Sequence, residues 1–600
     1  MTLLAGWINT SIRNQDTELL MTQIIKQLPE YLKKQSSVEF AGTASLAGKT
    51  GEIFKEHGCL LINTGQEPIA DKAKDYLQIF KQKGSGCVEQ FSGRYSFVLI
   101  NPEQQTLILV TDSIGKNHIY YAQTKNGLVI GSSADIVIAH PEVKDDISAQ
   151  SVFDYVYFHH CPSPNTIYTQ VKKLENGQAL VYDNGQIKLH YYWQPEFTEQ
   201  LHCSVAEAGT QLQEKLIEAV KTLSKEPEKT GAFLSGGLDS SSVAGALSKV
   251  YPKQAQSFTM GFPVEGYDEI EYARIAVKHF DLQPHEFYLT PEDTVKAIPE
   301  IAAYYDEPFG NSSALAAYYC AKMAKEQGID VLLAGDGGDE LFAGNERYAK
   351  QLLFDYYHKV PKPLATALES ILNGLPSSLA QNKLLFKAKR YIEQAKEPMP
   401  DRLQDYNFLH RHDVKDIFQA DFLQSVQTEE PLNLLRSSYQ RPENASTLNR
   451  MLIMDWKTTL HDNDLVKVNR MSEMAGVDVR YPLLDQEIIY LSTHIPSDLK
   501  LKGQQLRWFY KQAFKDFLPE QIINKSKHGF GLPFGIWLKD YQPLKELAYD
   551  SINSLKKRHY FKSEFLEHAI EMHQSIHAAY YGELIWILMM LELWFQGKKQ

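Results

Sequence analysis

Cysteine is scarce in this chain of 600 residues, and the few cysteines form no pattern. The five of them stand far apart, and no two have the C-x-x-C spacing of a zinc or redox site: Cys59, Cys87, Cys161, Cys203 and Cys320. Scattered, unpaired cysteines are typical of a reducing compartment. We therefore predict a cytoplasmic protein without a disulfide framework and without a structural zinc site.

Long apolar runs and a basic charge balance are missing as well. The strongest apolar run, 584–591, ends at Glu592 and is far shorter than the ~20 residues that a membrane span needs. Large residues in and after it, among them Trp586 and Trp594, indicate a buried terminal helix instead. No signal peptide is evident at the N-terminus. A formal net charge of −12 argues against a nucleic-acid partner. We expect neither a membrane nor a nucleic acid to be involved.

The chain is too long for one hydrophobic core, and its pattern changes near residue 200. Before that point, short alternating segments at 94–100, 106–111 and 127–131 are separated by turn residues. This rhythm predicts paired antiparallel strands with a few helices. We expect one domain over residues 1–200 and a second over residues 204–600.

In the second domain strands alternate with helices, which predicts a parallel sheet. The predicted helices cover 204–223 and 268–280, and the predicted strands cover 256–261, 285–289 and 329–334. From about residue 345 onward the pattern is helical and shows no convincing strand. The remainder is therefore expected to be a helical cover.

The most informative stretch is 231–241, where a short apolar strand leads into a Ser-Gly-Gly turn and then into a helix. Gly236 and Gly237 let the backbone approach an anion, and the helix beginning near Leu238 adds free N–H groups. Three hydroxyls can donate to the same anion: Ser235, Ser240 and Ser241. The stretch therefore predicts a cradle for an oxyanion.

Asp239 stands at the mouth of this cradle and would repel a bare phosphate. It calls for a cation, most simply Mg²⁺ bound to the carboxylate and to polyphosphate oxygens. The stretch lacks the Gly-x-x-x-x-Gly-Lys-Ser/Thr pattern of a Walker loop. Its spacing is instead similar to the Ser-Gly-Gly-x-Asp-Ser loop of enzymes that cleave ATP between the α and β phosphates. A Gly/Ser-rich turn with no such role is the alternative.

Two further stretches, 334–344 and 524–535, hold charged residues that could take part in a reaction. The glycine-rich stretch 334–344 follows a predicted strand, so Asp336 and Asp339 can approach the ligand of Asp239 and complete a Mg²⁺ site. An ordinary Asp/Gly surface turn is the alternative. The stretch 524–535 places two lysines beside a Gly/Pro-rich loop. A lysine ammonium there would stabilise a developing oxyanion. The alternative is that both lysines are ordinary charged residues on a solvent-exposed face.

Taken together, these clusters resemble the asparagine synthetase B family over nearly the whole chain. The matching segments are 235–241, 257–262, 266–274, 305–309, 335–342, 465–472, 476–485 and 527–533, and in the first domain 4–7, 91–97, 112–115, 120–121, 171–174 and Gly177. The resemblance implies an N-terminal α+β domain, an Ntn-hydrolase-like αββα sandwich that serves as a glutaminase. It implies that an α/β domain follows, a PP-loop ATP pyrophosphatase with a parallel sheet and a helical C-terminal cover.

The resemblance also implies the ligands and their contacts. ATP would contact Leu234, Met260, Ala334 and Gly335, and its pyrophosphate would contact Ser235, Gly236, Gly237, Asp239, Ser240 and Ser241. Mg²⁺ would be held by Asp239 and Asp339. Asp336 occupies the catalytic acidic position, and Lys527 matches the lysine that stabilises the adenylate and the tetrahedral intermediate.

Departures from the family pattern concentrate in the first domain. Where glutamine-dependent members have a nucleophilic cysteine directly after the initiator Met, this chain has Thr2. The Asn-Gly-Glu turn that binds glutamine is altered to 63–67 (Asn-Thr-Gly-Gln-Glu), and Arg-Asp-x-x-Gly has become 111–115 (Thr-Asp-Ser-Ile-Gly). We interpret the domain as a silent glutaminase, with an unusual threonine hydrolase as the alternative.

A synthetase without its own ammonia source needs another amine. Relatives of this kind are the β-lactam synthetases and the cyclases of lasso peptides, in which the amine is tethered to the activated carboxyl. Segments 475–484 and 527–535 look most like the lasso cyclases. The resemblance implies a precursor peptide as the substrate and a leader-peptide-processing protease as a partner. Asparagine synthesis from ammonia or glutamine, a β-lactam-synthetase-like ring closure and a non-catalytic scaffold are the alternatives.

Several histidines could suggest a metal. His573 and His577 stand four apart on a predicted helix, and the pairs His159–His160 and His410–His412 are similarly close. Without a third ligand nearby, we interpret all of them as surface histidines.

Overall fold

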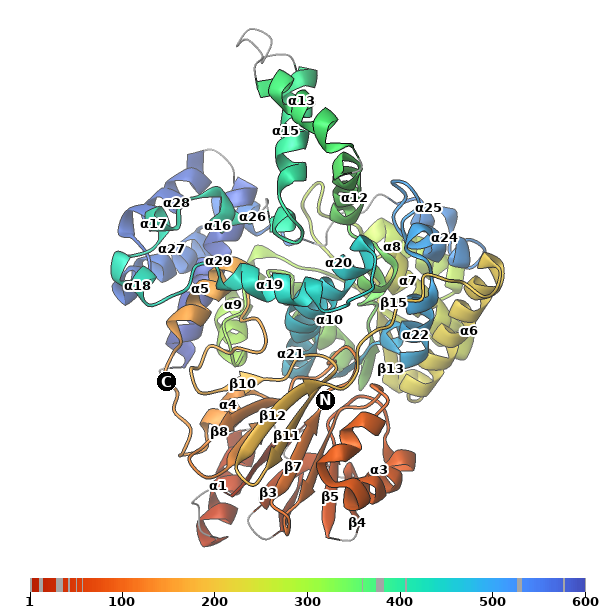
Figure 1. Ribbon diagram of the computed structural model, residues 1–600, viewed down its shortest axis with the longest axis vertical. Helices are drawn as coiled ribbons and strands as arrows, with labels where there is room; N and C mark the ends of the chain where they lie inside the picture. Colours follow the sequence, from red (N-terminus) through yellow and green to blue (C-terminus); the bar gives the residue numbers. More distant parts are fainter. Residues whose placement is uncertain are drawn as a thin grey trace.

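The computed structural model describes residues 3–9, 14–27, 36–41, 44–49, 51–56, 58–358, 360–373, 383–404, 407–525, 531–575 and 578–598. Thr2, Lys527 and His577, which the sequence singled out, lie outside the described residues. Figure 1 shows a strand-rich domain at one end, a helix-rich domain above it, and a helical arm at the far end.

Two six-stranded antiparallel sheets form the N-terminal domain. The first has the order β10 (Lys172–Lys173), β8 (Tyr120–Gln123), β9 (Leu128–Gly131), β1 (Leu4–Ile8), β3 (Ala44–Lys49) and β2 (Ser36–Ala41). The second has the order β12 (Gln186–Tyr191), β11 (Gln178–Asp183), β7 (Thr106–Val110), β6 (Phe97–Asn101), β5 (Cys59–Asn63) and β4 (Ile53–Glu56). Side chains from both sheets, among them Leu4, Ile130, Ile62 and Val98, share one buried core. The sheets therefore pack face to face.

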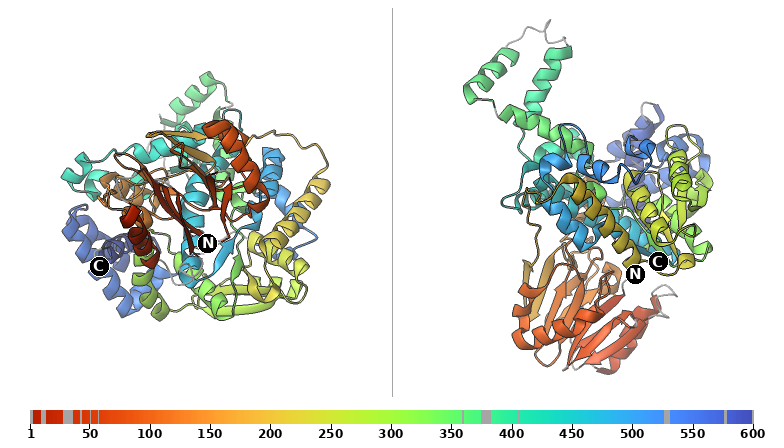
Figure 2. Two further views of the ribbon diagram at one scale, coloured as in Figure 1. Left: turned by 90° about the horizontal axis from the view of Figure 1, so that it is seen from below. Right: turned by 90° about the vertical axis from the view of Figure 1, so that its right-hand side faces the viewer.

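Helices cover the outer faces of both sheets. Helix α3 (Ala70–Lys83) buries Tyr76, Leu77 and Phe80 against the second sheet. On the first sheet, α1 (Asn14–Gln27) and α4 (Ala134–Ile138) contact the strands, and α5 (Ala149–Phe158) shares their buried cluster. The layers run helix, sheet, sheet, helix, which confirms the predicted αββα sandwich (Figure 2).

The second domain is built on a parallel sheet, as predicted, and the sheet has five strands. Its order is β15 (Gln283–Tyr288), β14 (Gln256–Gly261), β13 (Thr230–Phe233), β16 (Val331–Leu333) and β17 (Asp478–Arg480). Helices that connect or flank these strands are α6 (Val205–Leu223), α7 (Leu238–Val250), α8 (Ile270–Phe280), α9 (Pro291–Tyr304) and α10 (Ala314–Glu326). The carboxyl ends of β13, β14 and β16 meet at one edge, where ligands bind in such sheets.

One strand contradicts the expectation that no strand follows residue 345. Strand β17 pairs in parallel with β16, Val479 lying opposite Leu332. It has three residues, and charged Asp478 and Arg480 flank the buried Val479. So short a segment has no readable alternation, and only the neighbouring β16 makes it a strand.

Helices make up the rest of the chain. They are α11 (Gly338–Phe342), α12 (Glu346–His358), α13 (Lys362–Asn373), α15 (Lys383–Lys396), α16 (Phe408–Arg411), α17 (Val414–Ile417), α18 (Ala420–Gln424), α19 (Glu430–Gln440), α20 (Thr447–Asp455), the π-helix η4 (Trp456–Asp464), α21 (Leu465–Ala475), α22 (Gln486–His494), α23 (Ser497–Lys500), α24 (Trp508–Phe514), α25 (Glu520–Ile523), α26 (Phe534–Asp540), α27 (Gln542–Leu555), α28 (Ser563–Ser575) and α29 (Ala578–Gly597). Helices α12, α13 and α15 form the projecting arm (Figures 1 and 2).

Helix α29 confirms the predicted buried terminal helix, because Trp586 and Trp594 are each at most 1 % exposed. Among the described residues, none of the helices combines the length and apolar character that a membrane crossing requires.

Candidate active site

A cleft of about 510 Å³ opens at the carboxyl end of the parallel sheet. Its walls come from the loops after β13, β14 and β16, with α10 and α21 closing the sides. Most of the predicted site residues line it: Leu234, Ser235, Asp239, Ser240, Met260, Gly335, Asp336 and Asp339. The others do not line the cleft: Gly236, Gly237 and Ala334 lie in the same loops, and Ser241 lies on α7.

The Ser-Gly-Gly turn between β13 and α7 has the geometry of an anion cradle. Gly236 has a φ of 69°, and a Cβ there would lie 2.5 Å from the backbone nitrogen of Ala273. Only glycine fits this position. Ser240 Oγ accepts from the backbone N–H of Ser235 at 3.2 Å and lies 3.0 Å from Ser235 Oγ, so the hydroxyls brace the turn. Helix α7 starts directly after the turn and directs its free N–H groups toward the cleft edge.

The second acidic loop packs directly against the cradle. A Cβ on Gly335 would lie 2.7 Å from the backbone nitrogen of Ser240. Since no larger residue fits, the two loops are held in backbone contact, and Asp239 and Asp339 face the same space. The site needs residues from both loops, and the absence of a side chain at Gly335 allows the two loops to lie in contact.

Arg507 joins these two carboxylates, and sequence reasoning missed it. Its Nη1 lies 2.6 Å from Asp239 Oδ2 and 3.1 Å from Asp339 Oδ1, and its Nη2 also bonds Asp239. The guanidinium is nearly buried, while the two carboxylates remain 20 % and 26 % exposed. Arg507 sits just before α24 with a φ of 57°, a position that carries no sequence signal of its own.

These residues fit a Mg²⁺ ion on chemical grounds. Two carboxylates from separate loops already converge on one positive charge and keep part of their surface open. Carboxylate and phosphate oxygens are the ligands that Mg²⁺ prefers. When bound, the ion would neutralise polyphosphate charge, and Asp239 and Asp339 would be the side chains that hold it.

Asp336 lies in the same cleft near a second unpredicted cation. Burial raises the pKa of the Asp336 carboxyl to about 7, although the Lys467 ammonium opposes that shift. Lys467 lines the cleft and pairs with Asp464 at 2.8 Å. A carboxyl with a pKa near neutrality beside an ammonium is typical of a site that handles protons or charge.

The predicted lysine loop begins next to the cradle. Lys525 pairs with Glu269 at 3.0 Å and lies over the ring of Tyr272. Tyr272 is also the side chain that a Cβ on Gly236 would strike. Lys525, the last described residue before Lys527, therefore lies beside the cradle, and Lys527 itself lies outside the described residues.

The altered turn of the N-terminal domain, residues 63–67, is held by contacts with its neighbours and borders a cavity of about 240 Å³. The Asn63 amide donates to Glu52 at 2.8 Å and to the Glu67 carbonyl at 3.1 Å, and its oxygen accepts from the backbone N–H of Gly65. Glu67 is buried and forms an ion pair with buried Lys116 at 2.8 Å. Neighbouring residues thus supply hydrogen-bond and ion-pair partners to the side chains of Asn63 and Glu67 in the altered turn.

Two of the histidines interpreted as surface residues are buried, which corrects that prediction. His573 is 1 % exposed and its Nε2 lies 2.9 Å from the Gly535 carbonyl, and His160 is 5 % exposed. Packing of α28 against α26 buries His573, which no local pattern could reveal. His410 and His412 are exposed, as predicted.

A braced anion cradle and an acidic loop at the edge of a parallel sheet, beside an Ntn-type domain, define an ATP-dependent ligase that forms carbon–nitrogen bonds. The chain belongs to the asparagine synthase family, whose profile matches residues 211–596. A glutamine amidotransferase domain profile matches residues 73–193.

Individual relatives agree with this assignment. Asparagine synthetase [glutamine-hydrolyzing] 1 of Bacillus subtilis is 22% identical over 520 residues, covering 86% of this chain and 79% of that protein. A putative asparagine synthetase 2 of Methanocaldococcus jannaschii is 32% identical over 312 residues, covering 50% and 59%. Amidase chry2 of Gibberella zeae is 22% identical over 496 residues, covering 77% and 72%.

Proposed function

We propose that this ligase adenylates a carboxylate of a ribosomal precursor peptide and joins it to an amine of the same peptide as an isopeptide, closing a lasso-type macrolactam. The observation that carries the proposal is a contrast between the two domains. The residues of the ATP cleft are assembled and braced, whereas the N-terminal domain has Thr2 in place of the family's cysteine and an altered glutamine-binding turn at 63–67. Such an enzyme needs an amine other than glutamine-derived ammonia.

The first step uses the cleft to activate the carboxylate. An oxygen of the substrate carboxylate attacks the α-phosphorus of ATP, the bond to the β-phosphate oxygen breaks, and acyl-AMP and pyrophosphate form. Ser235, Ser240 and the first N–H groups of α7 are placed to hold the pyrophosphate. Arg507 and Mg²⁺ at Asp239 and Asp339 would compensate its charge.

The second step needs an amine at high effective concentration. The tethered amine attacks the acyl carbon, AMP leaves with the bonding electron pair, and the amine gives up one proton. Asp336 lies in the cleft with a pKa near 7, so it is suited to receive that proton. Lys527 would stabilise the tetrahedral oxyanion. Tethering raises the effective concentration of the amine far above that of free ammonia.

Asparagine synthesis is the second candidate, because the relatives in Bacillus subtilis and Methanocaldococcus jannaschii are called asparagine synthetases. On this alternative the cleft would activate free aspartate and accept dissolved ammonia. The two candidates share the adenylation step and differ only in the acceptor. A protease that removes the leader of the precursor would be a partner of the first candidate alone.

Mass spectrometry of the product separates them. Closure within a peptide lowers its mass by about one water, whereas amidation by ammonia lowers it by about one dalton. We expect loss of one water from a precursor peptide encoded beside this gene, with AMP formed in equal amount. The matched control carries Asp239→Ala and should leave the peptide unchanged. Conversion of free aspartate and ammonium to asparagine, with no peptide present, would defeat the cyclase proposal.

A further inference from the structure

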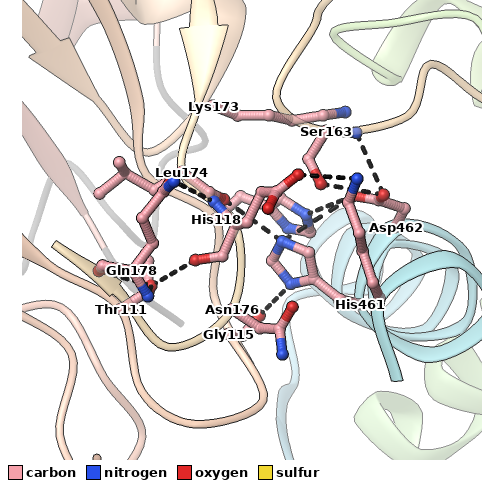
Figure 3. A network of polar contacts seen from close by, with 12 residues as sticks. Thr111, Gly115, His118, Ser163, Lys173, Leu174, Asn176, Gln178, His461 and Asp462 are labelled. Carbon is pink, nitrogen blue, oxygen red and sulfur yellow. Dashed lines mark hydrogen bonds and ion pairs between the residues drawn. The ribbon is translucent and has the colours of Figure 1, made fainter. Parts of the chain in front are cut away.

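A compact group of three polar side chains lies where the two domains meet, away from the ATP cleft. His118 belongs to the N-terminal domain, in the loop between β7 and β8, while His461 and Asp462 lie on the π-helix η4 of the second domain. Figure 3 shows the three side chains pointing toward one another, with Ser163 beside them. None of the three lines the ATP cleft.

The separations suit an ion better than direct hydrogen bonds. Asp462 Oδ1 lies 3.8 Å from His118 Nε2 and 3.8 Å from His461 Nε2. One ligand atom from each residue lies within 4.8 Å of the other two. Zinc–ligand bonds of about 2.0–2.1 Å place two tetrahedral ligands roughly 3.3 Å apart, so each of these two carboxylate–imidazole separations would have to shorten by about half an ångström. The imidazole rings, stacked with centroids 4.0 Å apart, would have to tilt toward the ion.

Two of the three ligand atoms are buried without a partner. Among the described residues, His118 Nε2 and Asp462 Oδ1 have no hydrogen bond. The other carboxylate oxygen, Asp462 Oδ2, accepts from the backbone N–H of Ser163 at 3.1 Å and from its Oγ at 3.0 Å. Ser163 therefore orients the carboxylate and leaves Oδ1 directed at the imidazoles. Buried polar atoms without partners are costly, which favours an additional ligand here.

The surroundings of His461 have the form of an outer coordination shell. Its Nδ1 lies 2.8 Å from the Gly115 carbonyl, and donation of that N–H would leave the Nε2 lone pair free toward Asp462. Metal-binding histidines commonly fix their ring in this way. Nε2 also lies 3.3 Å from the Leu174 carbonyl, a further oxygen at the site.

The carboxylate also needs a positive charge. Asp462 is fully buried, and in the part of the chain that the structure describes its ion-pair contacts are with the two histidines alone. The two ammonium groups that act on Asp462 from nearby pair with other residues. Lys173 lies 2.8 Å from Glu307 and 2.7 Å from the Cys161 carbonyl, and Lys457 lies 2.7 Å from Glu175. A buried carboxylate without a cation is strongly unfavourable.

We propose that His118, His461 and Asp462 bind one divalent transition-metal ion of the zinc class, which ties the two domains together. Two imidazoles and one carboxylate are a common ligand set for such ions. A cavity of about 60 Å³ borders the site on the side of His118, although neither His461 nor Asp462 lines it, and it has room for a water. The proposal departs from the prediction of no structural zinc site, which rested on cysteine spacing, because the ligands here are two imidazoles and a carboxylate.

Metal analysis of the full chain tests the proposal. Protein purified without a histidine tag and dialysed against Zn²⁺ should contain about one equivalent of zinc per chain. His118→Ala and Asp462→Asn should lose it, whereas His140→Ala, a variant of another buried histidine in the N-terminal domain, should retain it. Ser163→Ala should weaken Zn²⁺ binding about 10- to 100-fold, because it loosens the carboxylate. Substituting Co²⁺ should produce visible absorption bands that are missing in His118→Ala.

A second measurement covers variants that fail to fold. The thermal unfolding temperature of the wild-type chain should fall when a chelator removes the ion and recover on adding Zn²⁺. Wild-type protein that binds less than about a tenth of an equivalent of zinc, with an unfolding temperature that a chelator leaves unchanged, would overturn the proposal and leave a plain interdomain hydrogen-bond network.

Discussion

Arg507 Nη1 lies 2.6 Å from Asp239 Oδ2, and this contact joins two parts of the chain that are 268 residues apart. It places a nearly buried guanidinium at the mouth of the anion cradle, where pyrophosphate would form. A planar fork of donors suits both carboxylate and phosphate oxygens. Arg507 pairs with the two carboxylates, and on the proposed function it would also meet the leaving pyrophosphate.

Replacing Arg507 should slow adenylation more than it weakens ATP binding. Removing a fixed cation that acts where charge develops costs on the order of 10²- to 10³-fold in rate. ATP–pyrophosphate exchange with saturating peptide measures this for Arg507→Ala. The control is Arg274→Ala, which removes an arginine from ion pairs with Glu271 and Glu286 outside the cleft. Similar losses in both variants would exclude a specific role for Arg507.

Asp239→Ala and Asp339→Ala should each abolish Mg²⁺-dependent cleavage of ATP to AMP and pyrophosphate. Each carboxylate would neutralise part of the metal charge, and loss of one leaves the pyrophosphate poorly held. Chromatography of the nucleotides identifies the products, and circular dichroism checks the fold. Formation of ADP and phosphate by the wild-type chain would mean that the reaction class is wrong.

Lys527→Ala should lower turnover by about 10²- to 10³-fold with little change in ATP affinity, because a fixed ammonium acts mainly on the developing oxyanion. Lys525→Ala is the matched control. Lys525 is already engaged with Glu269 at 3.0 Å, so its loss should matter much less for turnover. Steady-state kinetics compare the two, and equal effects would refute the assignment of Lys527.

Glutamine should not be hydrolysed above background. Thr2 stands where the family has its thiol, and the turn that binds glutamine in the family is altered at 63–67. Ammonia release from glutamine is the measurement, with Thr2→Ala as the control. Release that disappears in Thr2→Ala would instead establish a threonine hydrolase.

Asp336→Asn should become more stable than wild type as pH rises. Burial raises the pKa of Asp336 to about 7, above the value of about 4 expected in the unfolded chain. The folded protein therefore holds a proton that the unfolded chain releases between those values, and ionising the wild-type carboxyl costs stability as pH rises through 7. Urea unfolding should show little difference near pH 4 and a difference that levels off above about pH 7. A difference independent of pH would contradict this origin.

Local sequence determined much of this protein. Strand β14 was predicted at its observed limits, 256–261, and the Ser-Gly-Gly cradle could be identified because strand, turn and helix start follow one another within 231–241. Neighbouring residues decide the backbone over such short stretches, through glycine conformation and free helix N–H groups. The same holds for the clusters that carry Asp336 and Asp339, whose place after a strand is a local property.

Tertiary structure alone decided the rest. Strand β17 exists because β16 lies beside it, and His573 is buried because α28 packs on α26. Arg507, Lys467 and the group of His118, His461 and Asp462 reach their partners from distant segments or from another domain. A single sequence carries no local signal for such long-range contacts, since they depend on how whole helices, strands and domains pack. Packing of the two domains and of the helical cover therefore set the charges around the cleft and the polar group between the domains.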